Sequence, residues 1–490
     1  MEAVWSVGHL AWQHHPGRFA DGSLENPVLR LKIANLSSSR GSVPAILKQK
    51  RSSPGTLHVA TTIYPTGGHT RVLANWLLHD SGGIPGIVLT NQTAPCPDFF
   101  EQAVVQAQGW MTQLPLSEPM AMRAARLREI SRQFKRVVLH THPNDPIPIA
   151  AFSASGGPPV AMFNHAHFNF CLGPTVSDVI INTMKHFRGV TDKFRFPRNT
   201  YILPSIPGMF QAGSAPINKQ DAKRKLGLNE TEPLVMSIGS ERYFKPAAGY
   251  DFFQTISKLL DAHPSINVVV VGVRQNCQFI PAGLRNRIRF RCVGPVLDPV
   301  PYYQAADICL ESFPMPSLGG LLEAAIHGEA FPIPVYGLNE CILRVSHAPT
   351  FTCSYRPKDE NDYLNYIVHL LNSPSETREQ ARSIRFSITQ FHKECSQGVV
   401  ELNRLIDGLK HAPCEIPCTT LDDSYDSQIL ADLNSDNFPT NCLPYGQAVR
   451  LQFLAAARGI ITTKMAAFET ARRPYTALKR RLRKRPTSST

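Results

Sequence analysis

The segment from Asp307 to Pro332, DICLESFPMPSLGGLLEAAIHGEAFP, constrains the fold of this chain more than any other. It begins with a short apolar run of strand type and ends in a helix that starts near Leu321, with small residues in the loop between them: Ser317, Gly319 and Gly320. Glycines at that point let backbone N–H groups approach an anion at the positive end of the helix. Glu323, in the first helical turn, can accept hydrogen bonds from both hydroxyls of a ribose. The segment therefore predicts a cradle for the phosphates and ribose of a nucleotide.

A second strand, loop and helix lie upstream. Residues 234–238 are predicted to form a strand that leads into a loop with Arg242 and Lys245. The helix that follows carries its apolar side chains on one face: Phe252, Phe253, Ile256, Leu259 and Leu260. Further buried strands are predicted for residues 267–273 and 287–290. Strands that alternate with helices indicate a parallel sheet with helices on both faces.

The first half of the chain shows the same alternation. A predicted strand over residues 57–64 leads through the glycine loop 66–71 into a helix at 72–80. After a second strand at 86–90 and a helix at 119–134, the later strands are predicted at 137–140, 159–165, 178–182 and 200–204. Ligands bind beyond the carboxyl ends of such strands, where the loop 66–71 must lie.

This order of elements resembles the GT-B glycosyltransferases, and the donor half is similar to family 4 enzymes and to O-linked N-acetylglucosamine transferases. The resemblance covers roughly residues 57–395 and implies an α/β fold with two Rossmann-like domains whose parallel sheets face a central cleft. The predicted parts are an N-terminal extension (1–56), an acceptor domain (57–205), a linker (206–232), a donor domain (233–409) and a helical extension with a basic tail (410–490). In this family an Arg and a Lys after the first donor-domain strand hold the diphosphate, which implies that role for Arg242 and Lys245. The alternative is that both are surface charges.

Histidines are the candidate catalytic groups of the first half. His69 lies in the glycine loop, and O-linked N-acetylglucosamine transferases carry a histidine in the corresponding loop. His165 and His167 follow the strand at 159–165, where similar enzymes also place a histidine. Imidazole titrates near neutral pH, so it can take a proton from an acceptor hydroxyl. A histidine that only caps the helix remains the alternative for His69. Further candidates for the cleft are Gly67, Gly68, Arg71, His140 and His142.

The spacing of His140 with His142, and of His165 with His167, would also suit zinc or iron. GT-B enzymes instead neutralise the leaving diphosphate with basic side chains and helix dipoles, so we expect no metal and no other cofactor. Many retaining enzymes of this fold carry two glutamates eight positions apart, whereas Met315 stands eight positions before Glu323. The stereochemical outcome therefore stays open.

The net charge of +13 is concentrated at the end of the chain, where residues 464–490 hold nine basic residues against Glu469 alone. Such a tail is either a solvated end or an anchor for an anionic surface such as a lipid leaflet or nucleic acid. No apolar run is long enough to cross a membrane, no secretory signal is recognised, and the eleven cysteines show no disulfide spacing. We expect a cytoplasmic protein, with peripheral attachment to the inner face of the membrane as an extension of that prediction.

The sequence thus predicts a glycosyltransferase that moves a sugar from a nucleotide sugar, most simply a UDP-sugar, to an acceptor hydroxyl. The acceptor is a glycan, a lipid or a protein, as in the synthesis of surface polysaccharide, and nucleic acid is not an expected partner. A nucleotide-sugar epimerase or sugar phosphorylase of the same fold is one alternative. A non-catalytic scaffold that docks on membranes or nucleic acid through residues 464–490 is another. An NAD-dependent dehydrogenase is excluded because no G-x-G-x-x-G follows the first strand.

Overall fold

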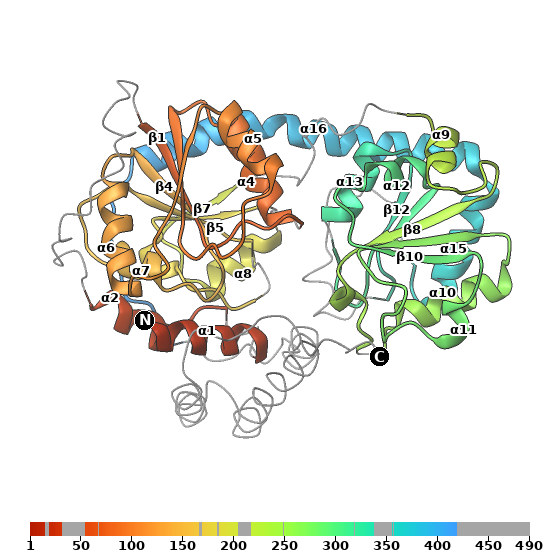
Figure 1. Ribbon diagram of the computed structural model, residues 1–490, viewed down its shortest axis with the longest axis horizontal. Coiled ribbons are helices and arrows are strands. Elements are labelled where there is room, and N and C mark those ends of the chain that lie inside the picture. The colour runs from red at the N-terminus through yellow and green to blue at the C-terminus, as the bar shows by residue number, and fades with distance from the viewer. Residues whose placement is uncertain are drawn as a thin grey trace, which may run out of the picture.

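The computed structural model describes residues 1–14, 19–31, 54–66, 68–165, 169–183, 186–203, 217–247, 249–317, 319–337, 355 and 357–418. These residues form two α/β units, each built around one parallel sheet, and a long helix runs across both (Figure 1). The predicted basic tail and residues 206–216 of the predicted linker lie outside the described residues.

The first sheet has seven parallel strands in the order β3-β2-β1-β4-β5-β6-β7. They are β1 (Pro54–Ala60), β2 (Ile84–Leu89), β3 (Trp110–Gln113), β4 (Arg136–His140), β5 (Val160–Phe163), β6 (Val179–Asn182) and β7 (Thr200–Ile202). Its helices are α4 (Gly68–His79), α5 (Asp98–Gln106), α6 (Met120–Ser131), α7 (Ile147–Ala151) and α8 (His186–Phe194). The chain reverses its direction of strand addition between β1 and β4, which is where ligands bind in open sheets of this kind.

The described part of the N-terminal extension belongs to this first domain. Helices α1 (Glu2–His14) and α2 (Gly22–Leu29) contribute Trp5, Leu10 and Val28 to the same buried cluster as Leu57 of β1. Sequence patterns gave no indication of this packing, because residues 32–53, which connect α2 to β1 and lie outside the described residues, are polar and basic.

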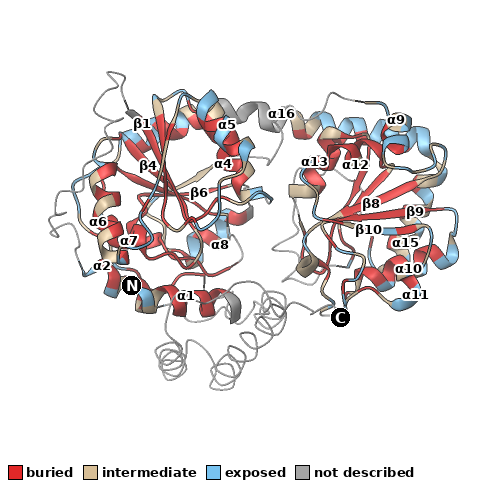
Figure 2. Ribbon diagram, in the orientation of Figure 1, coloured by how far each residue is buried: buried red, intermediate tan, exposed pale blue. Residues whose placement is uncertain are grey.

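The second sheet has five parallel strands in the order β10-β9-β8-β11-β12. They are β8 (Leu234–Ile238), β9 (Asn267–Val271), β10 (Phe290–Gly294), β11 (Ile308–Leu310) and β12 (Phe331–Ile333). Its helices are α9 (Lys219–Lys225), α10 (Phe252–Ala262), α11 (Ala282–Arg285), α12 (Val300–Ala305), α13 (Gly319–His327) and α15 (Glu360–Asn372). The apolar face predicted for α10 is buried throughout, and the strands of both sheets form the buried layer of their domains (Figure 2). The strand predicted at 287–290 in fact begins at Phe290, because Arg287 lies in the turn after α11.

Helix α16 (Pro374–Asp407) joins the two domains. Ile384 and Ile388 belong to the core of the second domain, whereas Leu402 and Ile406 pack into the first beside α4. At its end, Asp407 accepts hydrogen bonds of 2.8 and 2.6 Å from the buried Arg136 of β4. One helix therefore contributes to both cores and holds the domains together (Figure 1).

Among the described residues, no helix combines the length and apolar character needed to cross a bilayer. Within the same ranges the cysteines are free thiols, and no group of three or more His, Cys, Asp or Glu side chains is arranged to hold a metal ion.

Candidate functional site

The candidate site lies where the carboxyl-end edges of the two sheets meet. Phe194 of α8, which follows β6, packs in one cluster with Met315 and Tyr243, which follow β11 and β8. Arg71 of α4 reaches across the same boundary and donates a 3.3 Å hydrogen bond to the carbonyl of Leu297, in the loop after β10. Helix α13 lies on the side of the second domain that faces the first (Figure 1).

The first domain brings a stack of histidines to this edge. His69 is in the first turn of α4, and its ring stacks on that of His165, directly after β5, with centroids 4.2 Å apart. His142 follows β4 and stacks on Tyr64. His140 ends β4, with its ring centroid 6.1 Å from that of His69. The fold therefore gathers four of the predicted histidines from the start of α4 and from the carboxyl ends of β4 and β5.

His140 corrects one prediction. It is fully buried beneath the edge, so it does not line the site as expected. The side chain of His140 lies on the face of the sheet that α4 covers, where Trp76 of α4 packs edge-on against the imidazole ring. Gly67 and His167 lie outside the described residues, and Gly68 is exposed at the first position of α4.

Beneath the edge, His58 of β1 lies against His140, with Nδ1 of His58 3.0 Å from Nε2 of His140. The Nε2 of His58 lies 3.9 Å from the carboxylate of Asp80, which follows α4. Sequence reasoning missed both residues. The available signal was a histidine on the inward face of an otherwise apolar strand.

Burial controls the charge of these rings. It lowers the pKa of His165 to about 4 and that of His142 to about 3, and it holds the pKa of His69 and His140 well below the usual value. Repulsion among neighbouring imidazoles acts in the same direction. The rings are therefore neutral at neutral pH, the form that accepts a proton.

The second domain contributes Glu323 of α13. Its carboxylate accepts a 3.0 Å hydrogen bond from the hydroxyl of Tyr303, a residue of α12 that sequence reasoning did not select. Burial raises the pKa of Glu323 to about 7, while the positive charge of Arg71 acts to lower it. Glu323 therefore lies on the side of its domain that faces the first, within the electrostatic reach of a residue two positions from His69.

A carboxylate organises the small-residue loop before α13. Oε1 of Glu311 accepts hydrogen bonds from the backbone N–H and the hydroxyl of Ser317, both at 2.8 Å, and from the N–H of Ser312. Because Glu311 takes up these donors, Ser317 shapes the loop in this state and does not offer its N–H to a ligand. Helix α13 begins at Gly319, whose N–H donates to the carbonyl of Ser317, and the next N–H groups of its first turn have no acceptor within the helix.

Arg242 lies in the short 3-10 helix Glu241–Phe244 after β8, and Lys245 follows it directly. The Arg242 guanidinium lies over the ring of Tyr243, 4.9 Å from its centroid. Both cations thus follow β8, the strand that pairs with β11.

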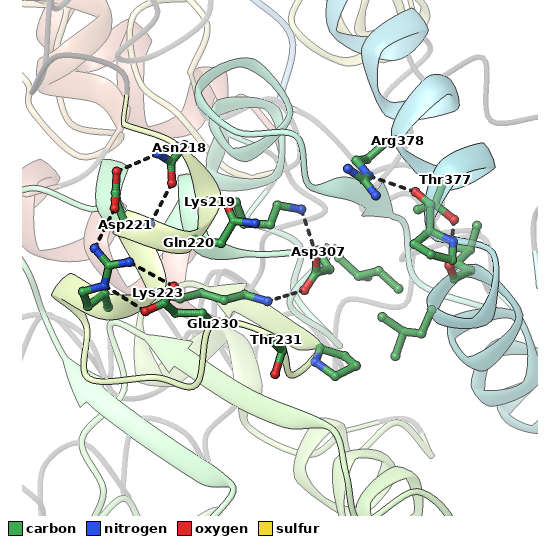
Figure 3. Close-up of a pocket in the computed structure, with 16 residues that line it drawn as sticks. Asn218, Lys219, Gln220, Asp221, Lys223, Glu230, Thr231, Asp307, Thr377 and Arg378 are labelled. Carbon is green, nitrogen blue, oxygen red and sulfur yellow. Dashed lines mark hydrogen bonds and ion pairs between the residues drawn. The ribbon is translucent and has the colours of Figure 1, made fainter.

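Asp307, at the start of the segment that predicted the nucleotide cradle, has a different place. Its carboxylate pairs with Lys219 at 2.8 Å and Lys223 at 3.0 Å and accepts the N–H of Leu234. Asp307 and the two lysines line a cavity of about 710 Å³ at the amino ends of β8 and β11, the opposite edge from the candidate site (Figure 3). Of the segment from Asp307 to Pro332, only the residues after β11 belong to the candidate site.

Comparison with solved structures agrees with this architecture. An O-GlcNAc transferase mutant from Thermobaculum terrenum superposes with a TM-score of 0.54 at 12% identity, covering 83% of this chain and 78% of that one. A glycosyltransferase from Rickettsia africae gives a TM-score of 0.55 at 10% identity, covering 72% of this chain and 98% of that one. The Anabaena protein HepE, solved with UDP and glucose, gives 0.50 at 13% identity, covering 72% and 98%.

The sequence matches no protein-family model, and no curated protein sequence is significantly similar to it. At these identities the similarity establishes the fold alone. Together with the two parallel sheets, it confirms the predicted GT-B fold.

Proposed function

We propose that this protein is a glycosyltransferase that moves a sugar from a nucleotide diphosphate-sugar, a UDP-sugar in the simplest case, to an acceptor hydroxyl. One observation carries the proposal: the His69–His165 pair of one domain and Glu323 of the other lie at the same domain boundary, connected through Arg71. The fold shared with the Rickettsia glycosyltransferase and with HepE in its complex with UDP supports it.

In this proposal the second domain binds the donor. The carboxylate of Glu323 accepts the ribose hydroxyls, and the diphosphate lies against the first turn of α13, near Arg242 and Lys245. The helix N-terminus and both cations favour the negative charge that builds up on the leaving diphosphate, without a metal ion. By analogy with oxyanion donors, each such contact contributes about 3 kcal/mol to lowering the barrier.

The first domain supplies the base. His69 takes the proton of the acceptor hydroxyl as its oxygen forms a bond to the anomeric carbon of the sugar. The bond from that carbon to the diphosphate oxygen breaks, and its electron pair leaves with the nucleotide diphosphate. A neutral imidazole is required for this step, and burial provides one.

Thermal unfolding with UDP and with a panel of UDP-sugars tests donor binding. We expect UDP to raise the melting temperature, and Glu323→Gln and Lys245→Ala to remove most of that shift. Lys258→Ala is a matched control, because Lys258 is an exposed lysine of α10 paired with Glu360. A donor domain that no nucleotide diphosphate stabilises would contradict the proposal.

Product analysis then identifies the reaction. Free UDP together with a glycosylated acceptor supports transfer. An isomerised UDP-sugar would indicate an epimerase, and a sugar phosphate formed from inorganic phosphate would indicate a phosphorylase.

A further inference from the structure

Three buried side chains that the proposed reaction does not use form a line beneath the candidate site. Asp80, His58 and His140 come from the end of α4, the middle of β1 and the end of β4. In the sheet register His58 pairs with Val138 and Ala60 pairs with His140, so both histidines point to the same sheet face. Trp76 covers both rings edge-on, at centroid distances of 5.7 and 5.3 Å.

Asp80 is held in a fixed orientation. It accepts hydrogen bonds from the hydroxyl of Thr56 at 2.6 Å, from the N–H of Gly82 at 2.9 Å and from the amide of Asn403 at 2.9 Å. Its Oδ2 lies 3.9 Å from Nε2 of His58. This separation exceeds a hydrogen bond, yet in a buried setting the negative charge favours the tautomer that turns an N–H toward it. The charge of Asp80 therefore assigns the Nε2–H tautomer to His58, whose Nε2 has no hydrogen-bond partner among the described residues.

The tautomer of His58 determines that of His140. With its proton on Nε2, His58 presents a lone pair on Nδ1, so the 3.0 Å contact requires His140 to donate from its Nε2. The Nδ1 of His140 is then also a lone pair. It is buried without a hydrogen-bond partner among the described residues, as is Nε2 of the neighbouring His69.

We propose that His140, held by His58 and Asp80, is a positioning residue that favours the Nε2–H tautomer of His69 and so leaves the Nδ1 lone pair of His69 as the proton acceptor. This inference rests on the proposed function for the identity of the base. The order of Asp80, His58 and His140 rests on the contacts above, and the step from His140 to His69 rests on their ring centroids 6.1 Å apart and on the two buried nitrogens that lack a partner among the described residues. In the reaction the proton from the acceptor hydroxyl bonds to Nδ1 of His69, and the resulting imidazolium directs its Nε2–H at the lone pair of His140.

Imidazole nitrogen NMR of 15N-histidine-labelled full-length protein tests the tautomers without any assay of activity. We expect His69, His140 and His58 each to show a protonated Nε2 and an unprotonated Nδ1 at neutral pH. In Asp80→Asn, His58 and His140 should shift toward a mixture of tautomers. A wild-type spectrum in which Nδ1 of His69 carries the proton would overturn the inference, whether or not the protein transfers sugars.

Two substitutions of His140 separate positioning from packing. Gln retains a donor toward His58 and an acceptor toward His69, whereas Phe retains only the bulk of the ring among Trp76 and Phe163. We expect His140→Phe to lower kcat on the order of 100-fold with little change in the donor KM, and His140→Gln to recover at least about a tenth of the wild-type kcat. If His140 only fills space, His140→Phe will equal or exceed His140→Gln in kcat, and the inference fails.

His411→Gln is the matched control. His411 is another buried histidine of the first domain, bonded to Asp178 and to the carbonyl of Phe152 at 2.8 Å each. Its replacement should lower the melting temperature and leave kcat and the His69 spectrum unchanged. If wild-type protein turns over no donor while the predicted tautomers are observed, the proposed function fails and the tautomer assignment stands.

Discussion

The histidine cluster predicts that the first domain loses stability when the pH falls from 8 to 5.5. Burial lowers the pKa of His165 to about 4 and that of His142 to about 3, whereas an unfolded histidine titrates near 6.5. Because the pKa is lower in the folded state, the unfolded chain binds more protons between these values. The stabilisation is complete above pH 6.5 and is lost as the pH falls toward 4.

The loss is large enough to measure. At pH 5.5 an unfolded histidine is about nine-tenths protonated, while His165 and His142 remain almost entirely neutral in the folded state. Each then contributes about 1.4 kcal/mol less to the free energy of unfolding than at pH 8. The two together lose about 3 kcal/mol, and His58, His69 and His140 act in the same direction. This is a substantial part of the roughly 5–15 kcal/mol that stabilises a typical domain.

Tryptophan fluorescence reports the first domain selectively. The four tryptophans of the chain, at positions 5, 12, 76 and 110, all lie in that domain, and Trp76 contacts both His58 and His140. Urea unfolding followed by this signal should show a lower midpoint at pH 5.5 than at pH 8. His142→Gln should reduce the pH-dependent loss by about 1.4 kcal/mol, and His263→Gln, in the second domain, should leave it unchanged. A wild-type midpoint that stays constant between pH 8 and pH 5.5 would refute the reasoning.

Three further predictions concern the donor domain and the link between domains. Because the pKa of Glu323 is about 7 and its carboxylate form accepts ribose hydroxyls, the affinity for UDP should rise about tenfold from pH 6 to pH 8 in calorimetric titrations, and Glu323→Gln should abolish this dependence. Gly320→Ala would place a Cβ 2.6 Å from Cγ2 of Ile238, so the Ile238 side chain or the start of α13 must shift. We expect the helix start to move and UDP affinity to fall by tenfold or more, and an unchanged Kd would contradict an anion site at that turn. Arg136→Met removes the two hydrogen bonds to Asp407 and a buried 3.0 Å hydrogen bond to the hydroxyl of Thr56. Since Asp407 is partly exposed, we expect a loss of about 2 kcal/mol in urea unfolding of the first domain, and Asp407→Asn, which keeps the bond to Thr56, should lose less; equal losses in the two variants would contradict this division.

Local sequence patterns predicted the strands and helices that surround the site. The buried face of α10 follows from its helical spacing of apolar residues, and β9 follows from a continuous run of valines. Glycines at 319 and 320 correctly marked the start of α13, because a small residue is needed where the helix approaches Ile238. These features depend on neighbouring residues in the chain, so a single sequence contains them.

The functions of individual polar residues were less accessible. Asp307 belongs to the same segment as Glu323, yet β11 places the two at opposite edges of the sheet, where Asp307 pairs with Lys219 and Lys223. Ser317 donates a hydrogen bond to Glu311, an acid to which the sequence analysis assigned no role. The separation of two residues in the sequence does not show whether their side chains lie at the same end of the sheet.

The amino-acid sequence by itself determined the alternation of strands and helices and the position of the glycine-rich helix start, because both follow from short-range periodicity and backbone preference. The two-domain GT-B plan was implied by the resemblance of this order of elements to known glycosyltransferases. Only the tertiary structure decided which polar groups meet. Because β4 lies beside β1, His140 contacts His58. Because α4 packs over the same face of the sheet, Asp80, which follows α4, lies near the other nitrogen of the His58 ring. Contacts between residues so far apart in the chain depend on strand order and on the face each side chain occupies, which are set by the burial of the whole sheet.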